Sequence, residues 1–459
     1  MDNVFLAQII IEAKTPLAVG TGDKNVITDQ PVSLDVNGLP YIPATSIAGV
    51  IRHLMSDKLS KDQLDKVDQV FGKQTDSIND SFGSRLIFSS AHMIGHDGKV
   101  KDGLQNINYQ NTFYNNFKDL PIRQHVRISN KGAAEHRGKF DNQVVYKGAR
   151  FCFELEMSSD AETFKQHKEV WEKVITSLNN PLFRLGGGTR KGYGEVGVIS
   201  VKTEELDLTK SEHLKQYLSK TSSLNNDFWI TTENDVKTAS ISTNLQHYRL
   251  ELEPDDFFLF SSGFESDDAD ITYLTESVIE WDAAEKPVFA EHKIVIPSSS
   301  VKGAILHRVA FHYNRLNKFF ADSLEKLPDT ADNKAVIALF GNSADGDQGQ
   351  RGKVLISDLF LQSNLLKKLL NHVSIDRFTG GAIAGALYSE EIVYGKGNSL
   401  VLDILAEPDT FSEKHNVEEA LTLALKDICT GMLPLGGGTM RGHGCFSGKL
   451  FINDKEVEL

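Results

Sequence analysis

Cysteine is scarce in this 459-residue chain, which contains only Cys152, Cys429 and Cys445, without CxxC spacing. We therefore expect no disulfide framework, no structural zinc site and a reduced, cytoplasmic protein. Long apolar runs are also missing: no run of about 18 apolar residues occurs, so no membrane span or membrane partner is predicted. The first residues, MDNVFLAQIIIEAK, have no basic region and no cleavage site, which argues against secretion.

Signatures of several catalytic classes are missing as well. The sequence shows no Ser/His/Asp pattern, no HExxH motif and no clustered metal ligands. Its glycine-rich phrase GGGTRKGYG is not a P-loop, because no GK[ST] follows four residues after a glycine, and it lacks the context of a dinucleotide fingerprint. Common hydrolase and redox chemistries are therefore not indicated.

The net charge of −14 is unfavourable for a protein that binds nucleic acid, but the charge is unevenly distributed. Residues 251–285 hold twelve acids and no Lys or Arg, whereas residues 123–150 hold seven bases and two acids. Phosphate responds to the local field, so the basic segment is a candidate phosphate-binding region. The alternative is that both segments are solvated loops.

An internal duplication dominates the rest of the sequence. Four phrases recur in the same order, about 250 residues apart. They are LPYIPATSIAGVIR (39–52) with IVIPSSSVKGAIL (294–306), VFG…SRLIFSS (70–90) with LFG…KVLISD (339–358), QHVRIS (124–129) with NHVSID (371–376), and RLGGGTRKGYGEV (184–196) with PLGGGTMRGHGCF (434–446). The chain therefore consists of two related halves.

Each half shows the order strand, helix, strand, strand, helix, strand, which predicts a ferredoxin-like α+β unit. We expect a first domain at 1–203, a polar, helix-poor connector at 204–245 and a second domain at 246–459. Insertions at 91–118 and 271–290 distinguish the halves; the first is either a functional arm or a disordered loop. The LIFSS and VLISD phrases are expected to be central strands.

Apolar spacing predicts two helices in each half. The first helices carry Ile47, Val50, Ile51 and Leu54 in one copy and Val301, Ile305 and Val309 in the other, with Ser300 as an expected N-cap. The second helices are expected to begin with capping boxes at Ser159–Glu162 and Asn416–Glu419.

Two repeated phrases are candidate anion sites. The glycine phrase offers the backbone N–H groups of Gly187, Gly188, Gly437 and Gly438 and the charges of Arg190, Lys191 and Arg441. The IPxxS phrase places Thr45, Ser46, Ser299 and Ser300 at helix N-termini, with Lys302 following in the second half only. Tight turns and simple helix caps are the alternatives.

Two aspartates are candidate catalytic residues. Asp29 and Asp270 each lie seven residues after a glycine, Gly22 or Gly263. A carboxylate beside a phosphate site could orient a ribose 2′-hydroxyl, act as a weak base or hold a divalent ion. The alternative is a solvated loop acid in both halves. His125 and His372 precede similar residues in both halves, and packing is their alternative role.

Taken together, the four phrase pairs resemble the RAMP superfamily of CRISPR systems, and most closely the backbone subunits of type III effector complexes. The resemblance covers nearly the whole chain apart from the connector and insertions, and includes HVSIDRFTGGAIAGALYSEEIVYGKG (372–397). It implies that each half binds guide RNA, stacks beside similar subunits and inserts a thumb-like hairpin, at 123–150 and 372–397, between guide and target.

The resemblance also implies particular site residues. Asp29 stands where the family's target-cutting aspartate is expected, and Asp270 is its counterpart, although 27 residues separate Asp270 from Pro297 against 14 between Asp29 and Pro43. The matched phrases add Arg52, Arg123, His125, Arg127, His372 and Arg377 as expected RNA contacts.

The expected function is therefore that of a backbone subunit that binds guide RNA and cleaves complementary target RNA. Its expected partners are guide RNA, target RNA and other effector subunits, and its expected cofactor is a divalent cation such as Mg²⁺. Two alternatives remain: a scaffold whose nuclease is another subunit, and an endoribonuclease that processes guide RNA.

Overall fold

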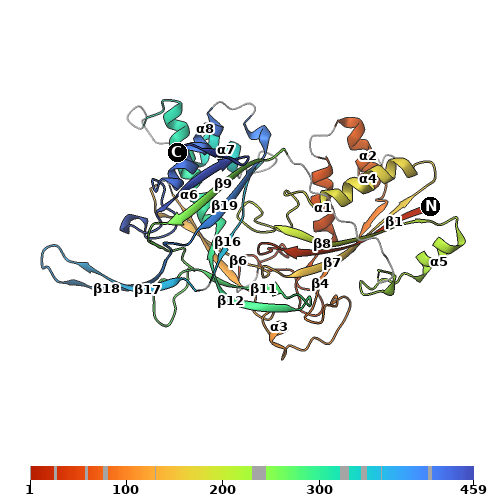
Figure 1. Cartoon of the computed structure of the whole chain (residues 1–459), viewed down its shortest axis with the longest axis horizontal. Coiled ribbons are helices and arrows are strands. Elements are labelled where there is room, and N and C mark those ends of the chain that lie inside the picture. Colours follow the sequence, from red (N-terminus) through yellow and green to blue (C-terminus); the bar gives the residue numbers. More distant parts are fainter. Residues whose placement is uncertain are drawn as a thin grey trace.

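The computed structural model describes residues 2–24, 28–56, 60–75, 81–129, 131–229, 244–320, 330–342, 349–362, 364–411 and 416–459. Two α+β units lie side by side, the N-terminal unit on the right and the C-terminal unit on the left of Figure 1. We call residues 2–207 module 1 and residues 246–459 module 2.

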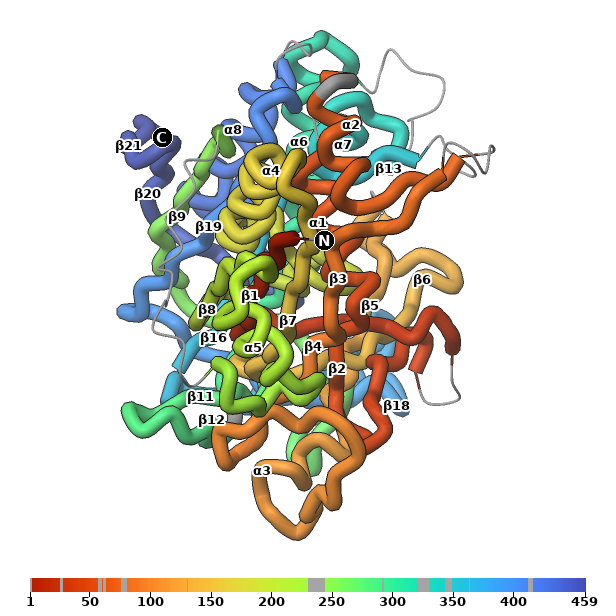
Figure 2. The backbone as a smooth tube through the Cα atoms, turned by 90° about the vertical axis from the view of Figure 1, so that its right-hand side faces the viewer, coloured from red at the N-terminus to blue at the C-terminus, as the bar shows by residue number. Residues whose placement is uncertain are grey.

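Module 1 is built on one antiparallel sheet in the order β2-β4-β7-β1-β8, with β3 also paired to β7. Helices α1 and α4 pack on this sheet through Ile51 and Val174, and β1 contributes Ile9 to the same core (Figure 2). The elements are β1 Asn3–Ala13, β2 Tyr41–Ile42, α1 Ala44–Ser56, α2 Lys61–Phe71, β3 Leu86–Phe88, β4 Ala91–Met93, α3 Thr112–Asn115, β7 Arg150–Ser159, α4 Phe164–Ser177 and β8 Val196–Asp207.

Module 2 repeats this arrangement with the sheet order β15-β19-β9-β20-β21. Helices α6 and α8 bury Ile305 and Leu425 against it. The elements are β9 Gln246–Pro254, β11 Thr275–Trp281, β12 Pro287–Ile296, α6 Ser298–Leu316, α7 Lys334–Phe340, β13 Gly341–Asn342, β14 Gln350–Arg351, β15 Val354–Ile356, β16 Leu359–Leu361, β19 Leu400–Ala406, α8 Val417–Cys429, β20 Phe446–Ile452 and β21 Lys455–Val457.

In both modules the strands follow the 4-1-3-2 order of a ferredoxin-like unit, which confirms the predicted fold class. Several local predictions were wrong. The LIFSS and VLISD phrases form short strands toward a sheet edge, not central strands. Helix α6 already begins at Ser298, so Ser300 is not its N-cap, and α4 begins at Phe164, after the expected capping box. Asn416 precedes α8 but makes no side-chain capping bond.

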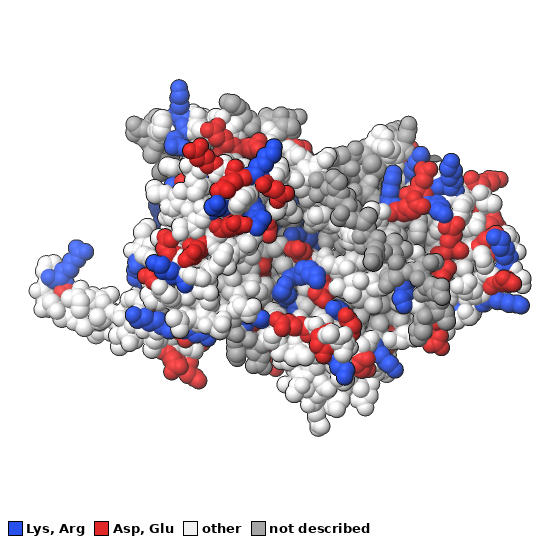
Figure 3. Space-filling model, in the orientation of Figure 1, with Lys and Arg blue, Asp and Glu red and all other residues white. Residues whose placement is uncertain are grey.

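A long hairpin leaves each module in the segment predicted to form a thumb. In module 1 it consists of β5 Ile122–Ile128 and β6 Ala134–Gln143, and in module 2 of β17 Leu366–Ile375 and β18 Ala382–Tyr394, extended by β10 Phe257–Phe258. The β17–β18 hairpin projects from the body (Figure 1) and is mostly uncharged on the face seen in Figure 3. Its exposed apolar side chains are Leu366, Leu369, Val373, Ile375, Phe378, Ile383 and Leu387.

The two insertions meet each other at the junction between the modules. Phe113 and Phe117, in and beside α3 of the first insertion, contact Phe289 on β12, which continues from the second insertion. Tyr146 of module 1 adds an edge-to-face contact to the same ring. The first insertion is therefore a packed element that helps to fix the modules together, and not a disordered loop.

The oppositely charged segments identified in the sequence are also partners at this junction. Arg123 from the basic segment forms an ion pair with Glu276 from the acidic segment and with Asp358. Arg150 pairs with Glu285 and stacks on Trp281 at 4.0 Å from the ring centroid. Two of the seven bases at 123–150, Arg123 and Arg150, therefore join the modules and do not face a ligand.

A glycine at this junction provides a matched test of the inter-module packing. A Cβ on Gly192 would lie 2.1 Å from Ser298 Oγ of module 2, whereas a Cβ on the equivalent Gly442 would meet nothing within 4 Å. Both glycines have positive φ, so alanine costs about 1–2 kcal/mol at either position. We predict that Gly192→Ala is less stable than Gly442→Ala by about 1–3 kcal/mol in urea unfolding. Equal losses would contradict the packing described here.

The connector is not as poor in helix as expected, since α5 Ser211–Ser219 and a 3₁₀ turn, η2 Asp227–Trp229, lie within it. Trp229 and Phe228 pack on β1 of module 1. Residues 230–243 lie outside the described part of the chain. None of the helices that the structure describes combines the length and apolarity needed to span a bilayer.

Candidate nucleic-acid interface

The two glycine phrases adopt the same conformation, held by matched backbone hydrogen bonds. Gly187 N–H donates to Ala18 O at 2.8 Å, and Gly437 N–H donates to Leu259 O at 2.7 Å. These two N–H groups are therefore occupied within each module, and the prediction that they bind RNA phosphates was wrong. The glycines place the loop against the segment after the first strand, because a Cβ on Gly186 would lie 2.7 Å from Ala18 O.

Each glycine phrase instead directs a cation over an aromatic ring at the base of a thumb hairpin. Lys191 Nζ lies 4.5 Å from the ring centroid of Phe140, and the equivalent Arg441 guanidinium lies 5.8 Å from that of Tyr388. Behind each ring stacks a histidine: His125 on Phe140 at 5.0 Å and His372 on Tyr388 at 4.9 Å. We call this arrangement of cation, aromatic ring and histidine the thumb-base layer. It occurs in both modules.

The polar group behind the layer differs between the modules. In module 1, His125 Nε2 lies 2.8 Å from Tyr193 Oη. Burial, with the nearby charges of Lys191 and Arg123, lowers the pKa of His125 to about 4, so the ring is neutral at pH 7.

In module 2, the fully buried carboxylate of Glu390 contacts three side chains at once. Its oxygens lie 2.9 Å from His372 Nε2, 3.3 Å from His443 Nε2 and 2.5 Å from Arg441 Nη2. Sequence reasoning missed Glu390, because its partners come from β17 and from the glycine phrase, distant segments of the chain.

Asp29 lies beside the module 1 layer, bonded to the residue that follows Phe140. Its N–H donates to Asp141 Oδ1 at 2.8 Å, and Asp141 N–H donates back to Asp29 Oδ2 at 3.4 Å. The side chain is 43% exposed and lies 3.3 Å from Lys24 Nζ. Asp29 is therefore held by backbone contacts at the thumb base while its carboxylate remains accessible.

Asp270 has the equivalent position in module 2, where Ser389 follows Tyr388. Ser389 donates to Asp270 Oδ2 from its N–H at 2.7 Å and from its hydroxyl at 2.9 Å, and Asp270 N–H lies 3.2 Å from the same hydroxyl. These bonds lower the pKa of Asp270. The extra residues before Pro297 form the β11–β12 hairpin, so they leave the position of Asp270 unchanged.

A third cationic group extends the layer of module 1 toward module 2. Lys302 on α6 lies near Lys191 and Arg190 of the module 1 glycine phrase. Burial and the repulsion of these two cations lower the pKa of Lys302 to about 8. A cluster of cations that repel one another is stabilised by an anion, so this is a candidate phosphate position. Position 48, equivalent to Lys302, is alanine in module 1.

The model of the RAMP superfamily matches residues 10–197 and 290–447, one span in each module. The chain belongs to the RAMP superfamily. The CRISPR system Cms endoribonuclease Csm3 of Methanocaldococcus jannaschii is 27% identical over 210 residues, which cover 42% of this chain and 77% of the archaeal protein. Both findings support the resemblance inferred from the four phrase pairs.

The helix N-termini of the two RAMP modules are not alike. At α1, Thr45 is exposed, Ser46 is partly exposed and Ala44 N–H donates to Ser90 Oγ at 3.3 Å. At α6, Ser298 N–H donates to the carboxylate of Asp358 at 2.8 Å. An acid already lies at the α6 terminus, and this disfavours a second anion there. Ser299 is partly exposed and Ser300 is exposed in the same turn.

Several arginines expected to contact RNA have structural partners instead. Arg123 is 2% exposed between carboxylates, so the prediction that it binds RNA was wrong. Arg52 donates to Asp68 at 2.9 Å and to Gly72 O at 3.0 Å, and Arg190 donates to Gly352 O at 2.7 Å across the junction. Two other expected arginines are exposed on the thumbs: Arg127, 71% exposed on β5, and Arg377 after β17.

Proposed function

We propose that this protein is a two-module backbone subunit of a type III CRISPR ribonucleoprotein, that it binds guide RNA and that it cleaves the paired target RNA. The observation that carries the proposal is the repetition of one arrangement, a thumb-base layer with an accessible aspartate beside it, in two covalently joined RAMP modules. The name and activity of the archaeal relative support the assignment.

The chemistry of the thumb-base layer suits a ribose-phosphate strand. A cation that is at least partly exposed over an aromatic ring can meet a phosphate or stack beneath a base, and neither contact selects a base sequence. Guide pairing would then supply the specificity, as in other RNA-guided systems. The net charge of −14 does not oppose this, because Lys191 and Lys302 create a local positive field.

In the proposed cleavage step, Asp29 or Asp270 accepts a hydrogen bond from the 2′-hydroxyl of a target ribose. The 2′-oxygen attacks the adjacent phosphorus as its proton passes to the carboxylate, and the 5′-oxygen of the next nucleotide leaves and takes up a proton from water; the aspartic acid then returns its proton to water. The products are a 2′,3′-cyclic phosphate and a 5′-hydroxyl. The hydrogen bonds from Ser389 lower the pKa of Asp270, so this carboxylate is ionised at neutral pH and available as an acceptor.

The described residues offer only a partial set of ligands for the expected divalent ion. Among the described residues, no group of three His, Cys, Asp or Glu side chains is placed to hold a metal. Asp29 and Asp141 lie side by side, however, and Mg²⁺ commonly uses one or two carboxylates together with substrate phosphates. When bound there, such an ion would neutralise charge on the phosphate. Asp270 has a hydroxyl, not a second carboxylate, beside it.

We predict that Lys302→Met weakens RNA binding and lowers the slope of log affinity against log salt by about 0.7–0.9, as expected for one lost phosphate contact. Affinity of the unaltered protein should also fall as pH rises through about 8, because Lys302 then loses its proton. Filter binding at several salt concentrations measures the slope, and filter binding at pH 7 and pH 9 measures the effect of pH on affinity. Lys449→Met, which alters a lysine 59% exposed and paired with Glu456, is the control. Identical slopes for the two variants would rule out Lys302 as a phosphate contact.

The proposed function is tested by purifying the protein from its native host and sequencing the bound RNA. We expect short RNAs that combine repeat and spacer sequence, recovered together with other effector subunits. Recovery of the protein alone, without RNA or subunits, would contradict the proposal. Unprocessed repeat transcripts, cut within the repeat by the isolated protein, would favour a guide-processing enzyme.

A further inference from the structure

Strand β5 of the module 1 thumb lies against the loop of module 2 that carries Asp270. A Cβ on Gly263, in the turn of that loop, would lie 2.8 Å from Cβ and 3.1 Å from Cγ of Gln124 on β5. Arg123, the residue before Gln124, forms its ion pair with Glu276 of the same module 2 segment. The backbone of β5 is therefore anchored where Gln124 meets the loop, and the contact leaves no room for a methyl group on Gly263.

The contact at Gly263 is linked to Asp270 by hydrogen bonds within the loop. Ser262 N–H donates to Thr272 O at 2.9 Å, and the hydroxyl oxygens of the same two residues are 2.9 Å apart. Thr272 is two residues after Asp270, whose carboxylate accepts from Ser389 of β18. The loop of Asp270 is therefore held between the thumb of its own module and the thumb of module 1.

Gln124 also contacts the surroundings of Asp29. It pairs across the thumb hairpin with Asp141, whose carboxylate accepts a hydrogen bond from the Gln124 side chain. The same carboxylate accepts from Thr28 Oγ1 at 2.7 Å and from Asp29 N–H at 2.8 Å. Burial would raise the pKa of Asp141, but these three hydrogen bonds lower it. Asp141 is therefore ionised at neutral pH and holds the backbone of Asp29 in place.

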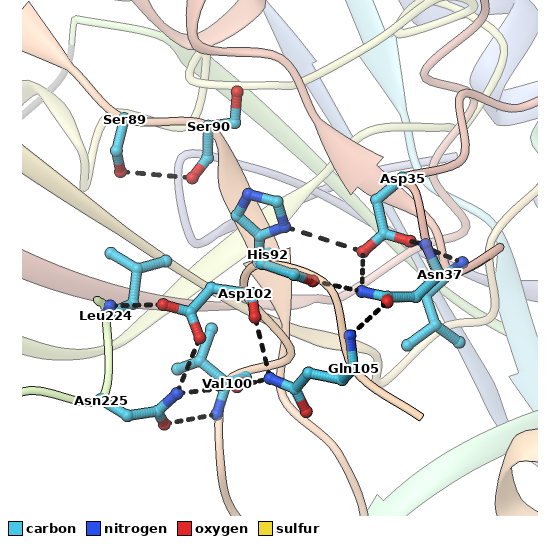
Figure 4. Close-up of polar contacts among 12 residues, drawn as sticks. Asp35, Asn37, Ser89, Ser90, His92, Val100, Asp102, Gln105, Leu224 and Asn225 are labelled. Atoms are coloured by element: carbon cyan, nitrogen blue, oxygen red, sulfur yellow. Dashed lines mark hydrogen bonds and ion pairs between the residues drawn. The ribbon is translucent and has the colours of Figure 1, made fainter. Parts of the chain in front are cut away.

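The Asp29 loop is secured on its far side by contacts within module 1. After Asp29 the chain turns at Asp35, whose carboxylate accepts from Asn37 N–H at 2.8 Å and from Leu39 N–H at 2.9 Å. The first insertion holds this turn, because Gln105 N–H donates to Asn37 Oδ1 at 2.8 Å (Figure 4). Module 1 therefore fixes its own loop, whereas the loop of module 2 rests on a side chain from the other module.

The equivalent positions of the repeat provide matched controls for the contact. Gly22 has the place of Gly263 in the Asp29 loop, but a Cβ on Gly22 would meet nothing within 4 Å among the described residues. Both glycines have positive φ, so alanine strains the backbone at either position. Asn371, the counterpart of Gln124 on β17, is exposed. Substitutions at Gly22 and Asn371 therefore repeat the chemical change without the contact between modules.

We propose that Gln124 is a positioning residue for both proposed cleavage sites. Its amide holds Asp141 beside Asp29, and its aliphatic carbons support the loop that carries Asp270. The cuts made by module 2 therefore depend on a side chain of module 1. This role rests on the proposed function, because it concerns the cleavage assigned to the two aspartates.

Gly263→Ala tests the contact with the module 2 loop. The added methyl group must push the loop away from β5. A displacement of about 1 Å in a reacting group can cost about 100-fold in rate, so we expect the cuts assigned to Asp270 to slow at least about tenfold more than Gly22→Ala slows those assigned to Asp29. Affinity for target RNA should not change. Adding Gln124→Gly to Gly263→Ala removes the overlapping Cβ and should return the Asp270 cuts to the rate of Gln124→Gly alone.

Gln124→Met tests the contact with Asp141. Methionine keeps the aliphatic carbons that face Gly263 but donates no hydrogen bond. The Asp29 cuts should therefore slow by about tenfold, the effect of one hydrogen bond to a charged group, while the Asp270 cuts continue at their usual rate. Asn371→Met should leave both sets of cuts unchanged.

The rates are measured by single-turnover cleavage of end-labelled target RNA, at saturating target, in assemblies isolated from the native host. A variant that merely weakens the fold would slow both sets of cuts together, and that result would overturn the proposal. Equal effects of Gly263→Ala and Gly22→Ala would also overturn it. If Asp29→Ala and Asp270→Ala cleave normally, the proposed function fails and the role of Gln124 fails with it. If those two variants lose their cuts while the Gln124 variants do not, only the role of Gln124 is wrong.

Discussion

Asp29→Ala is expected to remove one set of target cuts while guide RNA stays bound. The carboxylate is accessible, and the bond that Asp29 N–H donates to Asp141 Oδ1 remains after substitution, so alanine deletes a functional group without releasing the loop. Loss of a general base or of an orienting carboxylate costs about 10²–10⁴-fold in rate. The effect is measured with end-labelled target RNA on a sequencing gel.

The matched variants make this result specific. Asp270→Ala should remove the neighbouring set of cuts, because Asp270 is held at the same position of its own thumb hairpin. Asp23→Ala and Asp268→Ala change exposed acids of the same two loops and should cut normally. If Asp29→Ala with Asp270→Ala cleaves like the unaltered protein, the chain is a scaffold and the nuclease belongs to another subunit.

Arg123→Ala is expected to cause the largest loss of stability of any single substitution at the junction. Burial alone would lower the pKa of this guanidinium, but the charges of Asp358 and Glu276 raise it well above its usual value. Removing it leaves two buried carboxylates facing each other, which costs about 3–5 kcal/mol. Differential scanning calorimetry should show a lower melting temperature and separate transitions for the two modules.

Two further variants separate charge from packing. Arg127→Ala removes a 71% exposed arginine from the same strand and should melt within a degree or so of the unaltered protein. Combining Arg123→Met with Glu276→Gln and Asp358→Asn removes the charges together, and this triple variant should recover much of the stability lost in Arg123→Ala. If Arg123→Ala melts like Arg127→Ala, Arg123 does not hold the modules together.

The parts of this fold that could be predicted from the sequence depend on local patterns that recur. The repeated phrases fixed the two modules, and apolar spacing placed α1 and α6 because one face of each helix must be buried. The aspartates were located by their distance from a glycine turn. The structure adds that Asp270 and Asp29 are equivalent in spite of the longer segment before Pro297, since that segment folds into its own hairpin.

The parts that could not be predicted depend on contacts between distant residues. Arg123 looked like a phosphate ligand in a basic segment, but its carboxylate partners lie 153 and 235 residues away. Gly187 looked like a free donor, but the acceptor at Ala18 becomes adjacent only when the module folds. Glu390 carries no local signal, because a single glutamate on a strand is ordinary until three cationic or imidazole groups converge on it.

Ultraviolet crosslinking of the bound RNA, followed by mass spectrometry of the peptides, tests the central claim most directly. The account predicts crosslinked nucleotides on both thumb-base layers, at Phe140 with Lys191 and at Tyr388 with Arg441, in comparable yield. Crosslinks confined to one module, or found only on surfaces away from both layers, would contradict it.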